Sequence, residues 1–264
     1  MARPWRPLVY AHSQLPTRRT WERRLTALPQ HLPGWIGGVG RHLVALLTPW
    51  TAHGRAAAVD RTALTTRGGV WHTQHKAPGE MPHTAIDTDA GWSKSGWHGW
   101  WHGWWSGGKR PLAVSVGAVW IPLAAELPPA HVADHPVAPR LLDPLPAEVR
   151  DVLGDTHDHD PEVRQPGEPS HRALVATRRG AYPPHEDGVE VRRIFHTLRS
   201  QAIEPCNGLL KHIFAWRTPL PVNGLQRSPL LALGAIVMYH LVWLYHHAPH
   251  LTPGQGMKPL FRAA

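Results

Sequence analysis

The sequence predicts an α/β protein in which helices cover a mixed sheet. Short apolar runs of strand length alternate along the chain with longer segments whose apolar residues recur at helical spacing. The chain has 264 residues, of which 42% are hydrophobic, so it is long enough to bury one sizeable core. The predicted order of elements is strand, hairpin, helix, strand, helix, strand, helix.

Residues 1–53 are predicted to form a basic segment with helical parts. Thr20 is suited to cap a helix that continues through Arg23–Leu28. A second helical piece is expected from Gly38 to Leu47, with Pro49 ending it.

The first strand is predicted at Ala56–Val59, directly before Asp60. A short apolar run followed by polar residues favours a buried strand whose carboxyl end presents an acid. Residues 65–108 are rich in Gly, Thr, His and Trp and show no hydrophobic period. They are therefore expected to form a long irregular insertion.

A β-hairpin is predicted next, from Leu112–Val116 and Val119–Leu127, because Gly117-Ala118 suits a two-residue turn. Proline donates no backbone hydrogen bond, so Pro111 and Pro122 are expected at edge or terminal positions of the sheet.

Two further strands and three helices complete the predicted fold. The strands are Val149–Leu153, which ends at Gly154-Asp155, and Ala173–Ala176. Helices are expected at Val132–Leu142, at Val191–Trp216 and at Leu230–His247, and Asp160-Pro161 suits the start of a short helix. Pro205 should kink the second of these helices or start a new one.

The charge balance indicates a polyanionic partner. Lys and Arg outnumber Asp and Glu by 28 to 19, which gives a net charge of +9 and fits binding to nucleic acid or an anionic surface. Cys206 is the lone cysteine, which excludes a disulfide framework and a cysteine zinc site and fits a reducing cytoplasm. No signal peptide is expected at the N-terminus, and no membrane contact is predicted, since Leu230–Tyr245 is short for a span.

Three acids are candidates for a metal site: Asp60, Asp155 and Glu204. The first two follow predicted strands, and parallel neighbouring strands bring their carboxyl ends to one rim of a sheet. A helix that crosses this rim would add Glu204. Carboxylate oxygens suit Mg²⁺, and two such ions can drive phosphodiester chemistry. Taken singly, each acid is more simply explained as a turn, cap or first-turn residue.

The surroundings of these acids resemble the motifs of bacterial insertion-sequence transposases with a DDE, ribonuclease H-like catalytic domain. Ala57–Thr62 resembles the first motif, Val152–Asp160 the second, and Arg199–Lys211 the third. In the third motif an Arg precedes the Glu and a Lys follows it by seven positions. The intervening chain also matches, at Gly91–Lys94, Lys109 and Ala130–Asp134.

This resemblance implies metal-dependent cleavage and strand transfer at the ends of a mobile element. Asp60, Asp155 and Glu204 would hold two Mg²⁺ or Mn²⁺ ions. Further roles are implied for four residues, with Arg199, Lys211 and Lys109 facing DNA and Asn207 supporting the site. The implied partner is double-stranded DNA, bound by a homodimer at the nucleoid of a bacterial cytoplasm.

The resemblance implies three segments. A basic helical segment comes first, the expected catalytic domain spans residues 54–217, and an apolar helix and tail follow at 218–264. The sequence also departs from the family. Arg61 replaces a small residue after the first acid, where it would compete with metal for Asp60, and His196 replaces the Tyr that begins the third motif. Prolines interrupt several expected elements. These departures suggest a decayed copy of a transposase.

Three alternatives stay open. A non-catalytic DNA-binding protein derived from a transposase would use the basic N-terminal segment and the Trp-rich stretch. A zinc site would use the pairs His98 and His102 or His157 and His159, without a visible full ligand set. A membrane-associated or structural role would depend on the apolar run Leu230–Tyr245.

Overall fold

The computed structural model describes residues 17–47, 55–66, 87, 89–95, 103–117, 119–133, 136–154, 173–176, 186–214, 219–224 and 227–247. Within them, helices and strands follow one another along the chain as α2 (Arg18–Ala27), η1 (Leu28–Gln30), α3 (Leu32–Leu46), β1 (Ala56–Thr65), β2 (Gly91–Ser95), β3 (Gly103–Ser115), β4 (Pro122–Ala125), α4 (Ala138–Leu142), β5 (Asp151–Gly154), β6 (Ala173–Ala176), α6 (Glu186–Ile213) and α7 (Arg227–His247).

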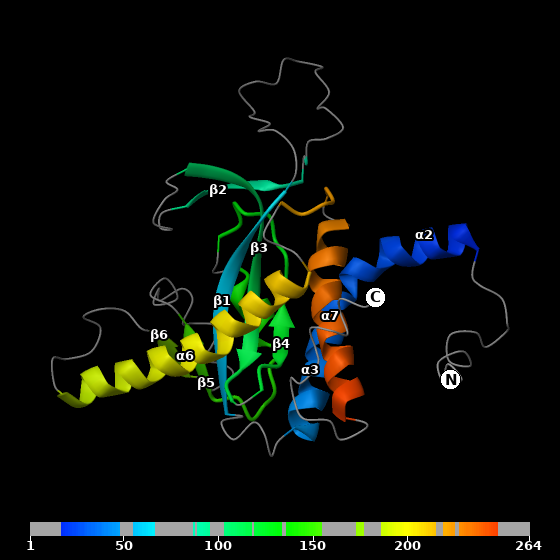
Figure 1. Ribbon diagram of the computed structural model, residues 1–264. Helices are drawn as coiled ribbons and strands as arrows, with labels where there is room; N and C mark the ends of the chain where they lie inside the picture. Colours follow the sequence, from blue (N-terminus) through cyan, green and yellow to red (C-terminus); the bar gives the residue numbers. More distant parts are fainter. Residues whose placement is uncertain are drawn as a thin grey trace.

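The strands of the described chain form one mixed, six-stranded sheet (Figure 1). Its order is β2-β3-β1-β5-β6, and β4 also pairs with β3. The strands up to β4 pair antiparallel, whereas β5 is parallel to β1 and β6 is parallel to β5. The expected mixed α/β sheet is therefore confirmed.

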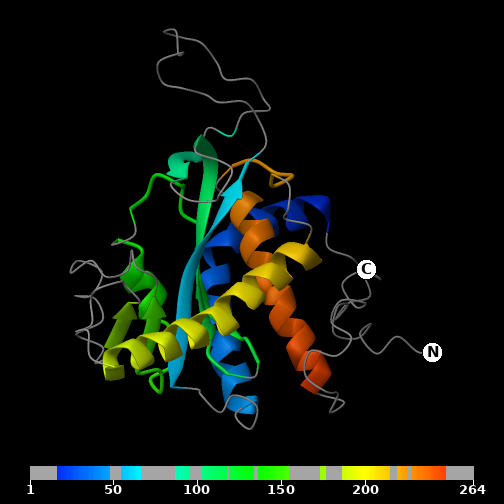
Figure 2. The same cartoon turned by 60° about the vertical axis from the view of Figure 1, so that its left-hand side comes forward.

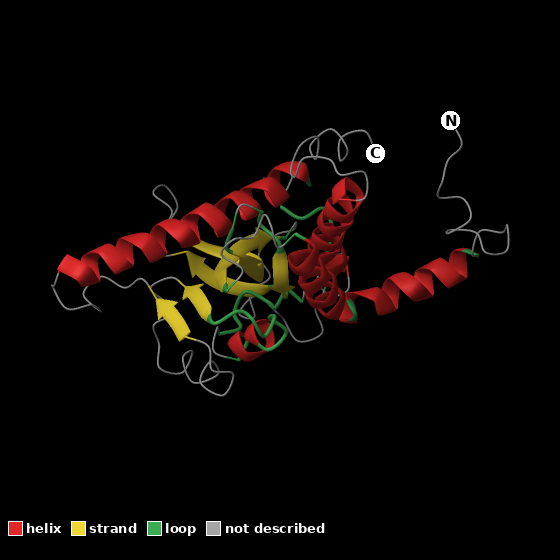
Figure 3. Cartoon of the chain, turned by 90° about the horizontal axis from the view of Figure 1, so that it is seen from below, coloured by secondary structure: helices red, strands yellow, loops and turns green. Residues whose placement is uncertain are grey.

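Helices lie on both faces and at one side of this sheet. Seen from below, α6 crosses one face and α4 lies against the other (Figure 3). The helices α3 and α7 run side by side and pack against β4 (Figure 2). One hydrophobic core includes buried residues of α3, the sheet, α6 and α7. The helices on either side of residues 54–217 thus share a core with that range.

Strand β1 is longer than predicted, because it runs past Asp60 to Thr65. Its pairing with β3 continues without a break from Ala57 opposite Ser115 to Thr65 opposite Gly107. From Thr62 to Thr65 the strand alternates between buried and exposed residues, as expected where one face of a strand meets solvent. Asp60 therefore lies in the middle of a strand and not at its end.

The prediction of a fully irregular stretch at residues 65–108 is wrong, because β2 and the first half of β3 lie within it. Glycine residues interrupt the apolar alternation by which a strand is predicted from sequence. A Cβ atom on Gly107 would overlap the backbone carbonyl of Leu64 on β1, so the close approach of the two strands requires glycine there.

The expectation for Pro122 is confirmed and the one for Pro111 is wrong. Pro122 begins β4, which lies beside β3 off the main strand path. Pro111 lies within β3, between β1 and β4, opposite Arg61. Its carbonyl accepts a hydrogen bond from the Glu126 amide at 3.3 Å, an interaction that needs no N–H from proline.

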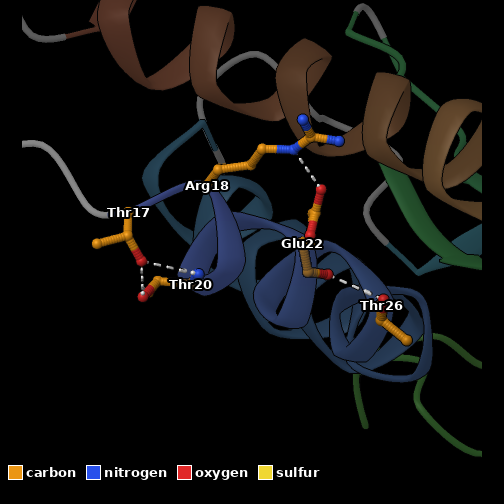
Figure 4. A network of polar contacts seen from close by, with 5 residues as sticks. All are labelled: Thr17, Arg18, Thr20, Glu22 and Thr26. Atoms are coloured by element: carbon orange, nitrogen blue, oxygen red, sulfur yellow. Dashed lines mark hydrogen bonds and ion pairs between the residues drawn. The ribbon is translucent and has the colours of Figure 1, made fainter.

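The first helix begins earlier than predicted. Thr17, and not Thr20, is the N-cap of α2, and its side-chain oxygen accepts a hydrogen bond from the Thr20 amide at 3.3 Å (Figure 4). On the next turn, Arg18 pairs with Glu22 at 2.7 Å. Helix α3 also starts earlier, at Leu32, since its buried Leu32 and Ile36 face the core.

The later elements correspond to their predictions with shifted limits. The expected helix at Val132–Leu142 is confined to α4, after Pro136. Helix α6 begins at Glu186 and continues through Pro205. Pro205 has no N–H to donate to the carbonyl of the residue four positions earlier, which is the exposed Gln201. The short helix expected at Asp160-Pro161 lies outside the described residues.

By length and composition α7 is apolar enough to cross a membrane, but 44% of its most apolar window is buried inside the protein. Its buried residues Ile236 and Tyr239 belong to the common core. This agrees with the prediction of a buried C-terminal helix.

Candidate functional site

The candidate site lies where α6 crosses β1. The Arg199 guanidinium on α6 forms an ion pair with the Asp60 carboxylate on β1, with 2.9 Å between Nη2 and Oδ1. Its Nε atom also donates to the backbone carbonyl of Val59, at 3.2 Å. The Arg199 side chain is 10% exposed and that of Asp60 is 27% exposed, so solvent reaches the carboxylate more than the guanidinium.

A second arginine is buried on the neighbouring strand β3. Arg110 on β3 is fully buried, and its Nη2 atom donates to Oδ1 of Asn207 on α6 at 2.7 Å. Burial lowers the pKa of Arg110 to about 10, and the nearby Cys206 and Asp60 partly oppose this. Arg110 is still protonated at neutral pH, so the strand carries a positive charge inside the molecule.

A third cation borders the cluster. Lys211, half-buried on α6, has a pKa lowered first by burial and then by Arg110, while Asp60 acts in the opposite direction. The buried Cys206 thiol has its pKa raised to about 12, mainly by burial. A thiol with so high a pKa stays protonated and is not a nucleophile at neutral pH.

The periodicity of α6 explains why these side chains meet. Its buried positions recur every three or four residues and so face the sheet together. They are Arg199, Ala202, Ile203, Cys206, Asn207 and Leu210. Glu204 falls outside this stripe and is exposed.

The structure brings together part of the predicted site. Asp60, Arg199, Asn207 and Lys211 surround the contact of β1 with α6. Glu204 is on the same helix but faces solvent. Asp155 lies outside the described residues, directly after the last residue of β5.

Lys109 is placed away from this cluster. It neighbours Arg110 on β3, and successive residues of a strand point to opposite faces of the sheet. Since Arg110 faces α6, the Lys109 side chain is directed toward the other face, while its backbone amide donates to the Pro128 carbonyl at 3.0 Å along the strand edge.

Sequence reasoning missed Arg110. A signal for it was present, because Arg110 precedes buried Leu112 and Val114 at a spacing of two along the strand. That alternation predicts a buried position. Two neighbouring features, Gly107-Gly108 and Pro111, masked it by making the run look unlike a central strand.

The ion-pair partner of Asp60 differs from the one expected. Arg61 was the predicted competitor for Asp60, whereas the structure pairs Arg199 with it at 2.9 Å. Strand alternation directs Arg61 to the face opposite Asp60. His196, at the start of the third motif, is exposed on α6.

The described residues contain no cluster of three or more His, Cys, Asp or Glu side chains that would hold a metal ion. The His pairs considered for zinc at residues 98 and 102 and at residues 157 and 159 lie outside the described chain.

Comparisons with known proteins find slight structural similarity to transposase complexes. No protein-family model and no curated protein matches the chain. A pre-cleavage Mos1 transpososome is similar with 14% identity and a TM-score of 0.26, over 83% of this chain and 62% of that chain. The Mos1 transposase paired-end complex with the left transposon end is similar with 14% identity and a TM-score of 0.25, over 89% of this chain and 66% of that chain. The chain spans less than two thirds of either solved chain, and scores of this size do not establish a family.

Proposed function

We propose that the chain is a DDE transposase domain with a ribonuclease H-like fold that cleaves and joins DNA at the ends of an insertion sequence. The register of β1 and β5 carries this proposal. These strands are parallel neighbours, with Ala58 opposite Leu153. In the sequence, Asp60 and Asp155 each come two positions after these paired residues, and we assign Asp155, which lies outside the described residues, to a position beside Asp60.

Asp60, Asp155 and Glu204 would hold Mg²⁺ or Mn²⁺ in this proposal. The partly exposed Asp60 carboxylate offers the oxygen ligands that these ions prefer, and a bound ion would compete with the Arg199 guanidinium that contacts one of its two oxygens. Bound divalent ions would activate the attacking oxygen and stabilise the leaving oxygen of a phosphodiester. The chain itself contributes cations, since Arg110 and Lys211 lie near enough to Asp60 for its negative charge to raise the pKa of both.

The three residues proposed to contact DNA lie in different surroundings in the structure. Lys211 borders the cluster and is half-buried, which suits a contact with the DNA backbone near the site. Arg199 is directed into the molecule, so it reaches DNA only after its ion pair with Asp60 opens. Lys109 would act from the opposite face of the sheet. A homodimer on double-stranded DNA in a bacterial cytoplasm remains part of this proposal.

The test is cleavage of a supercoiled plasmid that carries the DNA flanking the coding region, in Mg²⁺ or Mn²⁺. Wild-type protein should nick or linearise the plasmid, and Asp155→Asn and Asp60→Asn should each lower the rate at least about 100-fold. The matched control Asp143→Asn changes an exposed acid outside the site and should cleave like wild type. Equal cleavage rates for all four proteins would rule out Asp60 and Asp155 as the catalytic metal ligands.

A second candidate is a non-catalytic DNA-binding protein derived from a transposase. The cationic surroundings of Asp60 favour it, because Arg199, Arg110 and Lys211 lie around one carboxylate while Glu204 faces solvent. Such a protein would bind DNA with an affinity that falls steeply with salt and does not change in Asp155→Asn. Salt-sensitive binding without cleavage in either metal would decide for this candidate.

A further inference from the structure

An apolar groove lies between α2, α3 and α7, outside the β1–α6 contact. It has a volume of about 800 Å³ and is lined mostly by apolar side chains of these helices and of the short segments beside them. Helix α2 forms one wall, because it projects away from the sheet on the side of α3 and α7 (Figure 1, Figure 3). A groove of this size and lining is typical of a binding site.

One face of α7 forms the floor of the groove. Its lining residues recur at helical spacing from Arg227 to Met238. At about 1.5 Å per residue this stretch is about 16 Å long, which is the length of a three-turn helix. Gly234 lies in the middle of the stretch, and an added Cβ atom there would meet nothing within 4 Å. The floor therefore leaves room for another helix to lie against α7.

The walls of the groove expose large apolar side chains. Trp35 of α3 is 51% exposed, Met238 of α7 is 48% exposed and Leu25 of α2 is 44% exposed. Single apolar residues are ordinary at a protein surface, whereas several around one groove mark an interaction surface. An occupant would also stabilise α2, which has ten residues and no buried side chain.

The charges around the groove are mainly positive. Arg227 is exposed and lines one end of the floor. The Glu22 carboxylate in the lining is paired with Arg18 at 2.7 Å (Figure 4). Helix α2 carries further exposed arginines, which are Arg19, Arg23 and Arg24. An occupant with acidic side chains would complement this rim.

This charge argues against an occupant from the same protein. The chain has a net charge of +9, so a second copy would bring more positive charge to a positive rim. Residues 1–16 and 248–264 contain basic residues but neither Asp nor Glu, so they do not complement the rim either. A lipid bilayer is negative but too flat to enter a groove between three helices.

We propose that this groove binds an acidic amphipathic α-helix of a partner protein. The apolar side of that helix, with anchors at every third or fourth position, lies along α7 between Leu25 and Trp35. Its acidic side chains pair with Arg227 and with the arginines of α2. This inference does not depend on the proposed DNA chemistry, because none of the charged residues around the β1–α6 contact lines the groove.

Fluorescence anisotropy of the full chain with a labelled synthetic helix tests the proposal. The probe is a peptide of about 14 residues with Leu at every third or fourth position and Glu at most others. Wild type should bind it in the micromolar range. The same peptide with Lys in place of Glu should bind at least about tenfold more weakly, since it repels the arginines.

Gly234→Leu tests the place of binding. The new side chain occupies the floor of the groove, so the Glu peptide should bind at least about tenfold more weakly. The fold should be kept, because nothing lies within 4 Å of the added Cβ and leucine favours a helix over glycine. The matched control Gly208→Leu alters an exposed position of α6 with the same free space and should bind like wild type.

Arg227→Glu tests the charge. It should weaken binding of the Glu peptide and strengthen binding of the Lys peptide, each by about three- to tenfold. A glutamate in the first turn of α7 suits the helix dipole, so the variant should fold. The control Arg150→Glu makes the same change in net charge at an exposed position outside the lining and should alter neither affinity.

Weaker binding in Gly234→Leu, together with the changed preference of Arg227→Glu, supports the partner helix. Equal binding of the two peptides to wild type, or equal binding of the Glu peptide to wild type and Gly234→Leu, overturns it. Dimerisation of the chain that Gly234→Leu abolishes would assign the groove to a second copy. Binding of phosphatidylserine vesicles that Gly234→Leu abolishes would assign it to a lipid surface. Either result overturns the partner helix, and neither affects the plasmid cleavage test.

Discussion

At the scale of single residues, this protein places ionisable groups inside its core, each in contact with a polar group from another element. His240 on α7 is fully buried and contacts the Pro122 carbonyl through Nε2 at 2.9 Å. Arg110 has its amide partner in Asn207. A buried ionisable group has a different pKa and different hydrogen bonds in the folded and the unfolded chain. The free energy of unfolding therefore depends on pH through His240 and on the presence of a hydrogen-bond partner through Arg110.

His240 predicts a loss of stability in mild acid. Burial lowers its pKa to about 4, against about 6.5 in an unfolded chain. Between these values the unfolded state binds a proton that the folded state does not, so the free energy of unfolding falls as pH falls. The loss from His240 is about 2 kcal/mol between pH 7 and pH 5.

Urea unfolding at the two pH values measures this loss. His240→Gln keeps a side-chain donor for Pro122 but has no titrating ring, so its stability should change by about 2 kcal/mol less than that of wild type over the same interval. An identical pH dependence in both proteins would contradict the assignment.

Asn207 predicts a cost for removing the partner of a buried charge. Asn207→Ala deprives Arg110 of its 2.7 Å acceptor and should lower the free energy of unfolding by about 2–3 kcal/mol. Gln201→Ala alters an exposed position of the same helix and should cost less than about 0.5 kcal/mol. Comparable losses in the two variants would mean that the Arg110–Asn207 contact contributes little.

At the scale of elements, glycine decides how closely two parts of the chain approach. Gly40 of α3 lies against β4, where an added Cβ atom would overlap the Pro122 carbonyl. Gly38, on the same helix, has nothing within 4 Å of such an atom. The two glycines look alike in the sequence, yet only Gly40 is needed for helix and strand to pack.

These glycines predict opposite effects of the same substitution. Gly40→Ala should lower stability by about 1–3 kcal/mol, because β4 or α3 has to move away. Gly38→Ala should raise it by about 0.5–1 kcal/mol, since alanine favours a helix and meets no neighbour. Thermal unfolding followed by circular dichroism gives both values. A shift of the same sign in both variants would refute the packing of α3 on β4.

At the scale of the whole molecule, α3, the sheet, α6 and α7 share one hydrophobic core. The described helices α3 and α7 are far apart in sequence but lie side by side against β4 (Figure 1). A common core makes the unfolding of one part cooperative with the others. The terminal helices therefore stabilise the sheet on which the candidate site lies.

Ile236 of α7 tests this coupling. Ile236→Ala removes a fully buried side chain and should cost about 2–5 kcal/mol, whereas Met238→Ala, at an exposed position, should cost less than about 1 kcal/mol. Hydrogen exchange should show faster exchange in β1 and β3 as well as in α7 for Ile236→Ala. Loss of protection confined to α7 would indicate that this helix unfolds separately.

The sequence predicted the elements that have a clear hydrophobic period, and it failed where glycine and proline replace that period. Strands β1, β5 and β6 and helices α6 and α7 were found because their apolar residues repeat. Strand β2 and the start of β3 were not, since Gly107 supports a close strand contact without a side chain. Among the residues around the β1–α6 contact, the sequence identified Asp60, Arg199, Asn207 and Lys211. It did not identify Arg110.

By itself, the sequence determined the mixed α/β class, the strand that contains Asp60, the strand that ends just before Asp155, and the helix that carries Arg199 and Glu204. These features depend on the spacing of apolar residues within each segment, which the sequence shows directly. Only the tertiary structure decided that Arg199 pairs with Asp60, that Arg110 lies buried on Asn207, and that Glu204 faces solvent. Such contacts depend on where along the sheet α6 crosses β1 and β3, and that is set by the packing of segments far apart in the sequence.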